Sequence, residues 1–157
     1  MNRFLIAITL SLAGVASAHA QGKVEANPAN ACPNSNFKSH ELCFKTPGDG
    51  VARGETLSES FYAVILKTAE RCTITEDERL DAQKRFPQTK VFSTRFFCDD
   101  NIEENVSYTN VNDKFGFLAV YAGRTMKEAK ARLAEVQATG RFPGANIRTM
   151  QAKLVYP

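Results

Sequence analysis

The stretch LAVYAGRTMKEAKARLAEVQATGRFPGANI, Leu118 to Ile147, contains the pattern that decides the fold. It begins with an apolar run typical of a buried strand, followed by TMKE at residues 125 to 128, which has the form of a capping box. Apolar residues then recur at helical spacing as far as Val136, Gly140 ends the helix, and Pro143 redirects the chain into an extended segment. The stretch therefore predicts a strand, a helix and a second strand.

A weaker copy of this pattern lies earlier in the chain. RFP occurs at 85 and again at 141, and YAV at 62 matches LAV at 118, so both pairs share an offset of 56 residues. TEDE at residues 75 to 78 forms a second capping box. The remaining strands are expected in FYAVILKT (61–68), KVFSTRFFC (90–98) and ANIRTMQAKLVY (145–156), with an extra hairpin strand in VSYTNV (106–111).

Two such halves predict an α+β fold of the ferredoxin-like, βαβ-βαβ kind. In this arrangement the strands form one antiparallel sheet and both helices cover the same face. The helices are expected to pack on the sheet through a set of apolar residues, Leu80, Phe86, Met126, Leu133 and Val136. One face of the sheet is then covered and the other is left open.

The N-terminal region predicts export. Residues 1–20, MNRFLIAITLSLAGVASAHA, have the basic start, apolar run and small residues of a signal peptide. That run is too short for a transmembrane span and no second one follows, so we expect a periplasmic or secreted protein without a transmembrane anchor. Residues 21–60 are rich in Pro, Gly, Asn and Ser and are expected to form an irregular N-terminal arm, while residues 61–157 form the α+β domain.

Four cysteines, Cys32, Cys43, Cys72 and Cys98, predict two disulfide bonds in an exported chain. Three pairings are open. We prefer Cys32 with Cys43 and Cys72 with Cys98, because each bridge then closes a loop within its own part of the chain and the first one pins the arm. No CxxC pair is present and His40 is the one histidine after the leader, so the pattern supports neither a zinc site nor a Cys-His catalytic pair.

The distribution of charge gives little support to catalysis. Acidic side chains gather at residues 76–81 and 99–104, and none of them pairs with another reactive group, so we expect a protein that is not an enzyme and has no cofactor or metal. Residues 114–157 hold eight Lys or Arg against two Glu. Such a basic region is either an ordinary solvated helix surface or a surface that attracts an anionic polymer.

The stretch from Phe117 to Met150 resembles the second half of a SPOR domain, a small peptidoglycan-binding module of bacterial envelope proteins. It has that family's hydrophobic strand, Gly at the strand end, helix rich in Ala and Leu, and a phrase like GFPGA before the last strand. Residues 61–98 fit the first half only in outline, since Lys67 takes the place of the strand-end Gly and two cysteines are added. The resemblance implies binding to peptidoglycan glycan strands, in that family those stripped of peptide.

The open sheet face is the expected binding surface. If the second helix covers Leu118, Val120 and Ala122, strand alternation turns the neighbouring residues of the same strand to the open side. The 56-residue offset places Ala63, Ile65 and Lys67 there as well. The expected ligand-binding residues are Phe117, Tyr121, Arg95, Gln151 and Lys153, with rings for sugar C–H faces and polar groups for hydroxyls. The alternative is an ordinary half-buried sheet face that the N-terminal arm covers.

A different class of function is the alternative to glycan binding. A small exported protein with disulfides can also serve as an inhibitor or an adhesin that binds an envelope or secreted protein. KFGFLAVY, Lys114 to Tyr121, resembles the RNA-binding phrase of the RRM fold, but export and disulfides argue against a nucleic-acid partner.

Overall fold

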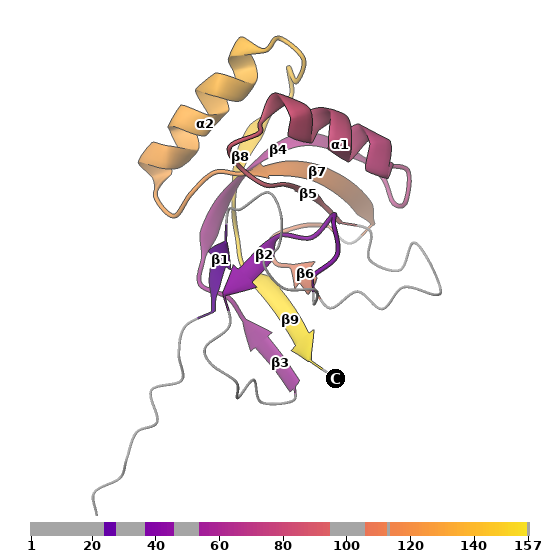
Figure 1. The fold of residues 1–157 in the computed structure, drawn as a ribbon, viewed down its shortest axis with the longest axis vertical. Coiled ribbons are helices and arrows are strands. Elements are labelled where there is room, and N and C mark those ends of the chain that lie inside the picture. Colours follow the sequence, from indigo (N-terminus) through magenta and orange to yellow (C-terminus); the bar gives the residue numbers. More distant parts are fainter. Residues whose placement is uncertain (1–23, 28–36, 46–53, 95–105, 113, 157) are drawn as a thin grey trace, which may run out of the picture.

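The structure is a computed structural model, and it describes residues 24–27, 37–45, 54–94, 106–112 and 114–156 (Figure 1). In chain order the described elements are β1 (Glu25–Asn27), β2 (Cys43–Lys45), β3 (Gly54–Leu57), β4 (Phe61–Glu70), α1 (Glu76–Arg85), β5 (Val91–Ser93), β6 (Val106–Tyr108), β7 (Phe115–Tyr121), α2 (Met126–Ala138), β8 (Asn146–Met150) and β9 (Ala152–Tyr156). None of the helices in these ranges is long and apolar enough to cross a membrane. The predicted signal peptide, residues 1–20, lies outside the described residues.

The central sheet has the strand order β5-β7-β4-β8, and every neighbouring pair is antiparallel. Both helices lie on the same side of this sheet (Figure 1). They cover a core that the two inner strands supply through Val64, Leu66, Leu118 and Val120. The predicted α+β class with an antiparallel sheet is therefore confirmed, and the arrangement is compatible with the ferredoxin-like fold.

Both helices begin at the predicted capping boxes. The hydroxyls of Thr75 and Thr125 each accept a hydrogen bond from a backbone N–H three residues on, and the glutamates there accept one in return. Gly123 stands between β7 and α2 with a φ of 96°, and a Cβ atom there would lie 2.6 Å from Cβ of Glu128. A side chain at this position would be strained as well as crowded, which accounts for the glycine at the strand end.

The predicted contacts of the helices are only partly correct. Phe86 and Val136 are buried and Leu133 packs against the same cluster, but Leu80 and Met126 are 42% and 44% exposed. The side chains that α1 buries instead include Arg79 and Gln83. Gln83 bridges to the backbone of the following segment: its amide donates to Thr89 O and accepts from Val91 N. This helix thus rests on the sheet through hydrogen bonds as well as apolar contacts.

The face of the central sheet away from the helices is covered, and the prediction of an open face is wrong. Leu42, Cys43 and Phe44 of the arm are buried against it, together with Val106 and Tyr108 of β6. The described parts of the arm are also not irregular, since they contain β1, β2 and β3. The physical reason is the short run ELCF, which supplies three buried apolar side chains in a segment that otherwise has the composition of a loop.

A three-stranded sheet of order β3-β9-β6 lies beyond the central sheet (Figure 1). The single strand predicted at 145–156 is in fact two strands, because the chain leaves the central sheet at Gln151. Ser58 stabilises this break: its N–H donates to Ala152 O at 2.8 Å and its hydroxyl accepts from Ala152 N at 2.9 Å. The same chain segment thereby contributes β8 to one sheet and β9 to the other.

A β-bulge in β4 lies at Leu66, where the pairing with β7 shifts between Ile65 and Lys67. The extra residue reverses the alternation of β4 beyond this point. Lys67, expected on the face away from the helices, therefore lies on the helix side and forms an ion pair with Glu78 of α1. That hydrogen bond from Lys67 lowers the pKa of Glu78. Thr68 lies opposite Phe117 and is on the face of the sheet away from the helices.

Cys43 and Cys72 each take part in a disulfide bond. The preferred pairings, Cys32 with Cys43 and Cys72 with Cys98, each include a residue outside the described ranges. These pairings stay predictions, and so does the expectation that a disulfide bond holds the arm in place.

Candidate functional site

The residues expected to bind a ligand do not form one surface. Phe117 and Tyr121 are only 3% and 7% exposed, because the arm and β6 cover them. Gln151 donates from its side-chain amide to Ser58 O at 3.0 Å, so it serves the break between β8 and β9. Lys153 pairs with Glu55 at 2.7 Å across β9 and β3. Arg95 lies outside the described residues.

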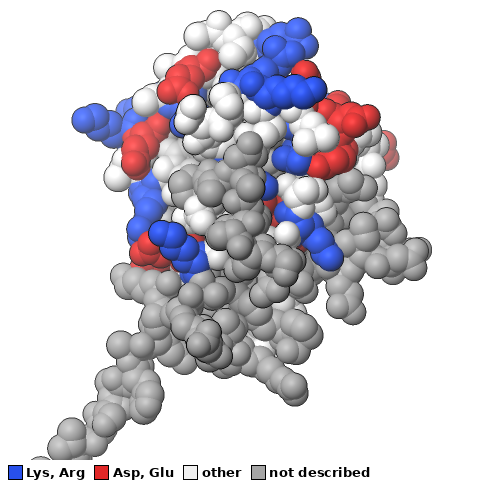
Figure 2. Space-filling model, viewed as in Figure 1, with Lys and Arg blue, Asp and Glu red and all other residues white. Residues whose placement is uncertain are grey.

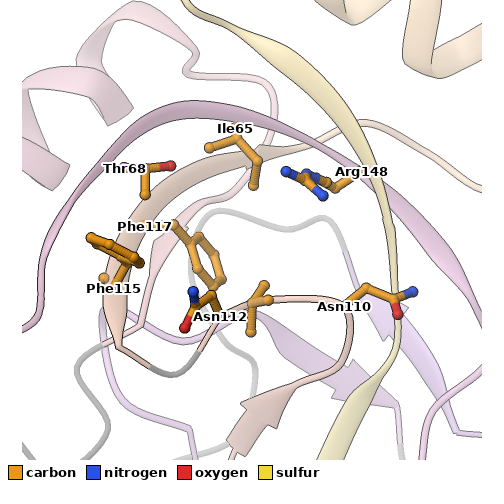
Figure 3. Close-up of a pocket in the computed structure, with 9 residues that line it drawn as sticks. Ile65, Thr68, Asn110, Asn112, Phe115, Phe117 and Arg148 are labelled. Carbon is orange, nitrogen blue, oxygen red and sulfur yellow. The ribbon is translucent and has the colours of Figure 1, made fainter.

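A pocket of about 280 Å³ lies on the face of the central sheet away from the helices, lined by side chains of β4, β7, β8 and the turn after β6 (Figure 3). We call it the Phe115 pocket, and its described lining consists of Ile65, Thr68, Asn110, Val111, Asn112, Phe115, Gly116, Phe117 and Arg148. The volume is close to the lower end of the roughly 300 to 1,000 Å³ that ligand pockets occupy. It is large enough for a small molecule or for one unit of a polymer.

Three strands and one turn build the Phe115 pocket. Phe115 and Phe117 alternate along β7 and so face the same side, and the bulge in β4 brings Thr68 opposite Phe117. Arg148 on β8 pairs with Ala63 of β4, which is two residues from Ile65 and therefore on the same face of the strand. Phe115 is 47% exposed although its neighbour Phe117 is buried. One ring therefore belongs to the core and the other is accessible to a ligand.

The described residues of the turn after β6, 109–112, form the polar wall of the Phe115 pocket. Asn110 has a positive φ of 58° and donates from its amide to Thr149 O at 3.0 Å, which fastens the turn to β8. Asn112 accepts from Lys114 N through its Oδ1 at 3.0 Å, so its amide N–H groups stay available. Thr109 fixes the base of the turn, because its hydroxyl accepts from Gln151 N at 2.9 Å. The wall is therefore preorganised by hydrogen bonds to the sheet.

Arg148 is the one charged side chain in the described lining of the Phe115 pocket. It is exposed, and it makes no ion pair with any residue that the structure describes. Its guanidinium extends from β8 toward the centre of the pocket (Figure 3). The pocket thus combines an accessible ring, hydroxyl and amide groups, and one cation, a mixture suited to a polar ligand with an apolar face.

The described lining of the Phe115 pocket offers an aromatic ring, hydroxyl and amide groups and one guanidinium. Its described lining contains no carboxylate, histidine, cysteine or lysine that could transfer a proton or attack a substrate. Groups of three or more potential metal ligands are also absent from the described part of the chain. The arrangement can hold a ligand by stacking and hydrogen bonds.

The basic region predicted in the C-terminal part is mixed with acidic groups. Arg124 pairs with Glu25 at 3.2 Å and also with Glu59, and Arg132 pairs with Glu135. Figure 2 shows Lys and Arg interspersed with Asp and Glu over the helical end of the molecule. The ion pairs of Arg124 join β1 and the segment just before β4 to the loop before α2, so part of this charge has a structural role.

A second pocket, of about 350 Å³, lies between α2 and the segment that follows α1. Its charged lining groups already have partners, since Arg132 pairs with Glu135 and Glu128 accepts from the backbone of Arg124 and Thr125. A ligand there would have to compete with these contacts. The Phe115 pocket is therefore the stronger candidate site.

Buried charges join the arm to α1 and β5. Lys90 is 2% exposed and donates to Ser39 O at 2.8 Å. Burial, reinforced by the positive charge of Arg79, lowers the pKa of Lys90 to about 8, although Glu76 and Glu41 act in the opposite direction. The charged form of Lys90 is thus disfavoured in the folded protein.

The free energy of unfolding is expected to rise with pH from about pH 8 upward because of Lys90. The unfolded chain, with a lysine pKa near 10.5, binds more protons in this range than the folded protein does. Urea unfolding between pH 7 and pH 9.5 measures this, and the upper limit keeps tyrosine ionisation small. Lys90→Met should remove the rise. An equal rise in both proteins would show that another group causes it.

Sequence reasoning missed Phe115 and Arg148 as site residues. Strand alternation from Phe117 indicated that Phe115 faces the same side of the sheet. The β-bulge that brings Thr68 beside these two residues could not be recognised in the sequence, because it lies in a run of apolar residues.

Comparisons of this chain with protein-family models, with curated proteins and with solved structures find no match.

Proposed function

We propose that this chain is an exported, non-catalytic protein that binds peptidoglycan glycan strands, and that the Phe115 pocket is its ligand site. The observation that carries the proposal is the pocket itself, with an accessible ring beside hydroxyl, amide and guanidinium groups. The C–H face of a sugar can lie on Phe115 while its hydroxyl and acetamido groups reach Thr68 and Asn112.

Two features of the sequence support this choice of ligand and compartment. The leader at residues 1–20 directs a chain to the periplasm or beyond, where peptidoglycan lies. The stretch from Phe117 to Met150 resembles the second half of a SPOR domain, whose members bind glycan strands. The proposal differs from the resemblance in its surface, because Phe117 and Tyr121 belong to the core here.

The test is sedimentation of the purified mature protein with cell-wall sacculi, before and after an amidase has removed the stem peptides. We expect sedimentation with both and more with the treated form, because the pocket admits a sugar more easily when no peptide branches from it. Phe115→Ala should weaken binding by about 1 to 3 kcal/mol, the scale of base stacking on aromatic side chains. It should leave the fold intact because Phe115 is half exposed.

Leu57→Ala is the matched control, since Leu57 is a similarly exposed apolar residue on β3, outside the described lining of the pocket. It should bind sacculi as the wild type does. If folded wild-type protein sediments with neither form at low salt, glycan binding is wrong, and an envelope or secreted protein becomes the candidate partner. Equal losses in both variants would mean that the Phe115 pocket is not the site.

A further inference from the structure

The outer edge of β8 presents backbone groups that the central sheet does not use. β8 is an end strand of that sheet, and its residues direct their N–H and C=O groups alternately toward β4 and away from it. Tyr62 lies opposite Thr149, and both its N–H and its C=O bond to the residues just after β7. Thr149 therefore directs its own N–H and C=O outward, and Ile147 and Ala145 follow the same alternation.

Part of this outer edge already has partners within the chain. The C=O of Thr149 accepts from the amide of Asn110, and the N–H of Ala145 donates to Phe142 O at 3.0 Å. Within the part of the chain that the structure describes, the other outward groups have no partner: the N–H of Thr149, the N–H and C=O of Ile147, and the C=O of Ala145. β8 itself contains neither a proline nor a β-bulge that would protect such an edge from pairing.

These remaining groups are complementary to themselves under a two-fold rotation about Ile147. If β8 of a second copy runs antiparallel beside it, Ile147 lies opposite its own counterpart, and the two residues exchange both N–H···O bonds. The N–H of Thr149 then meets the C=O of Ala145 in the second copy, and the reverse pair forms as well. Thr149 O and Ala145 N, which already have partners, face each other and need no further bond. The pairing thus uses every remaining group of both edges.

The side chains suit the same register. Ile147 is partly buried on the helix side of the sheet, so two apolar side chains meet at the axis. On the other face Arg148 lies across from Asn146 of the second copy, which keeps the two guanidinium groups from facing each other directly. A two-fold axis at Arg148 would bring these charges together. It would also direct the N–H of Ile147 at Thr149 O, which already accepts from Asn110.

We infer that β8 pairs with β8 of a second copy, so that the protein forms a symmetric dimer with one continuous antiparallel sheet. The inference goes beyond the proposed function and does not depend on it. A second copy is the partner that fits, because the free donors and acceptors of this edge match themselves and the charges stay apart in the same register. The contact is short, so the dimer is expected to be a weak one that forms at high protein concentration.

Analytical ultracentrifugation of the purified mature protein tests the dimer. The mass should rise from one copy to two between about 10 µM and 1 mM, the range of a weak interface. Thr149→Pro removes an outward N–H that the described chain does not use, and an edge strand tolerates proline at such a position. Because each dimer loses two hydrogen bonds, association should weaken about tenfold or more.

Thr149→Val is the matched control, since it keeps the N–H and the β-branched shape and loses only the hydroxyl. It should associate as the wild type does. Thr149 is exposed, so both variants are expected to fold, and thermal unfolding checks this.

Amide hydrogen exchange in the wild type locates the interface without any substitution. The amides of Ile147 and Thr149 should exchange fast at low protein concentration and slowly at high concentration. The amide of Arg148 is the internal control, because strand alternation directs it to Ala63 of β4, and it should be protected at both concentrations. If Thr149→Pro does not fold, the exchange data decide alone.

Four results would overturn the inference. The first is a wild type that stays monomeric at the highest concentration. The second is a dimer in which the amides of Ile147 and Thr149 exchange as fast as in the monomer, because the interface then lies elsewhere. The third is slow exchange of these amides in the dilute monomer, which would mean that another segment of the same chain covers the edge. The fourth is equal association of Thr149→Pro and Thr149→Val.

Discussion

Replacing Phe44 with alanine is expected to lower the free energy of unfolding by about 3 to 5 kcal/mol, the usual cost of removing a buried phenylalanine. Phe44 is 1% exposed, although it belongs to the N-terminal arm. Its ring lies 5.8 Å from that of Phe37 and 6.4 Å from that of Phe61, measured between centroids. The arm thereby supplies part of the core of the central sheet, and the cavity left by alanine could not close without moving several rings.

Urea unfolding under non-reducing conditions measures this loss, so that the disulfide of Cys43 stays intact in both proteins. Lys45→Ala is the control, because Lys45 is the exposed residue that directly follows Phe44 in the same strand and should change stability by less than about 0.5 kcal/mol. A loss below about 1 kcal/mol for Phe44→Ala would contradict the arm's place in the core.

Replacing Arg79 with methionine is expected to cost about 3 kcal/mol. Arg79 is 3% exposed, and it donates two hydrogen bonds to Glu76, at 2.6 and 2.9 Å, and one to Val91 O. Removing one partner of a buried pair typically costs about 3 to 5 kcal/mol. The lower end applies here because the side chain of Glu76 is 31% exposed. Relief of the repulsion between Arg79 and Lys90 also reduces the loss.

The pH dependence gives an independent check on Arg79. Burial alone would raise the pKa of Glu76, but the hydrogen bonds and charge of Arg79 outweigh it, and the pKa is lowered from 4.5. The stabilisation that the Arg79–Glu76 pair gives to the folded protein is therefore present above pH 4.5, and it is lost as the pH falls through the pKa of Glu76 in the folded protein. The stability difference between wild type and Arg79→Met should shrink in the same interval.

Arg85→Met is the matched control on the same helix. Arg85 forms an exposed pair with Asp81 at 3.0 Å, and such pairs contribute little, so this variant should lose less than about 0.5 kcal/mol. A comparable loss in both variants would indicate that a change of helix propensity, rather than the buried pair, explains the effect of Arg79→Met.

Local patterns predicted the helices and the inner strands of this protein well. The capping boxes at Thr75 and Thr125 act within one helical turn, so their effect can be read from adjacent residues. The alternation along β7 was also predicted correctly, with Leu118 and Val120 toward the helices and Phe117 on the other face. These features depend on neighbours in the sequence.

The features that sequence reasoning missed depend on contacts between distant segments. The bulge at Leu66 lies in a continuous apolar run, where a shift of one residue exchanges one apolar side chain for another and leaves no signal. The burial of Phe44 follows from a sheet face in another part of the chain, and the composition around it is that of a loop. The Phe115 pocket could not be predicted for the same reason, since it combines that bulge with a turn held to β8.

The place of β9 has a consequence for the order of folding during synthesis. This strand is the middle one of its sheet, yet it is made after every other described element (Figure 1). Gly54 pairs with Tyr156, and Val106 with Leu154, so neither outer strand has a partner until β9 has left the ribosome. Contacts this distant in sequence form slowly. The two outer strands thus stay unpaired while the chain is made, and their sheet is the last part of the described structure that can form.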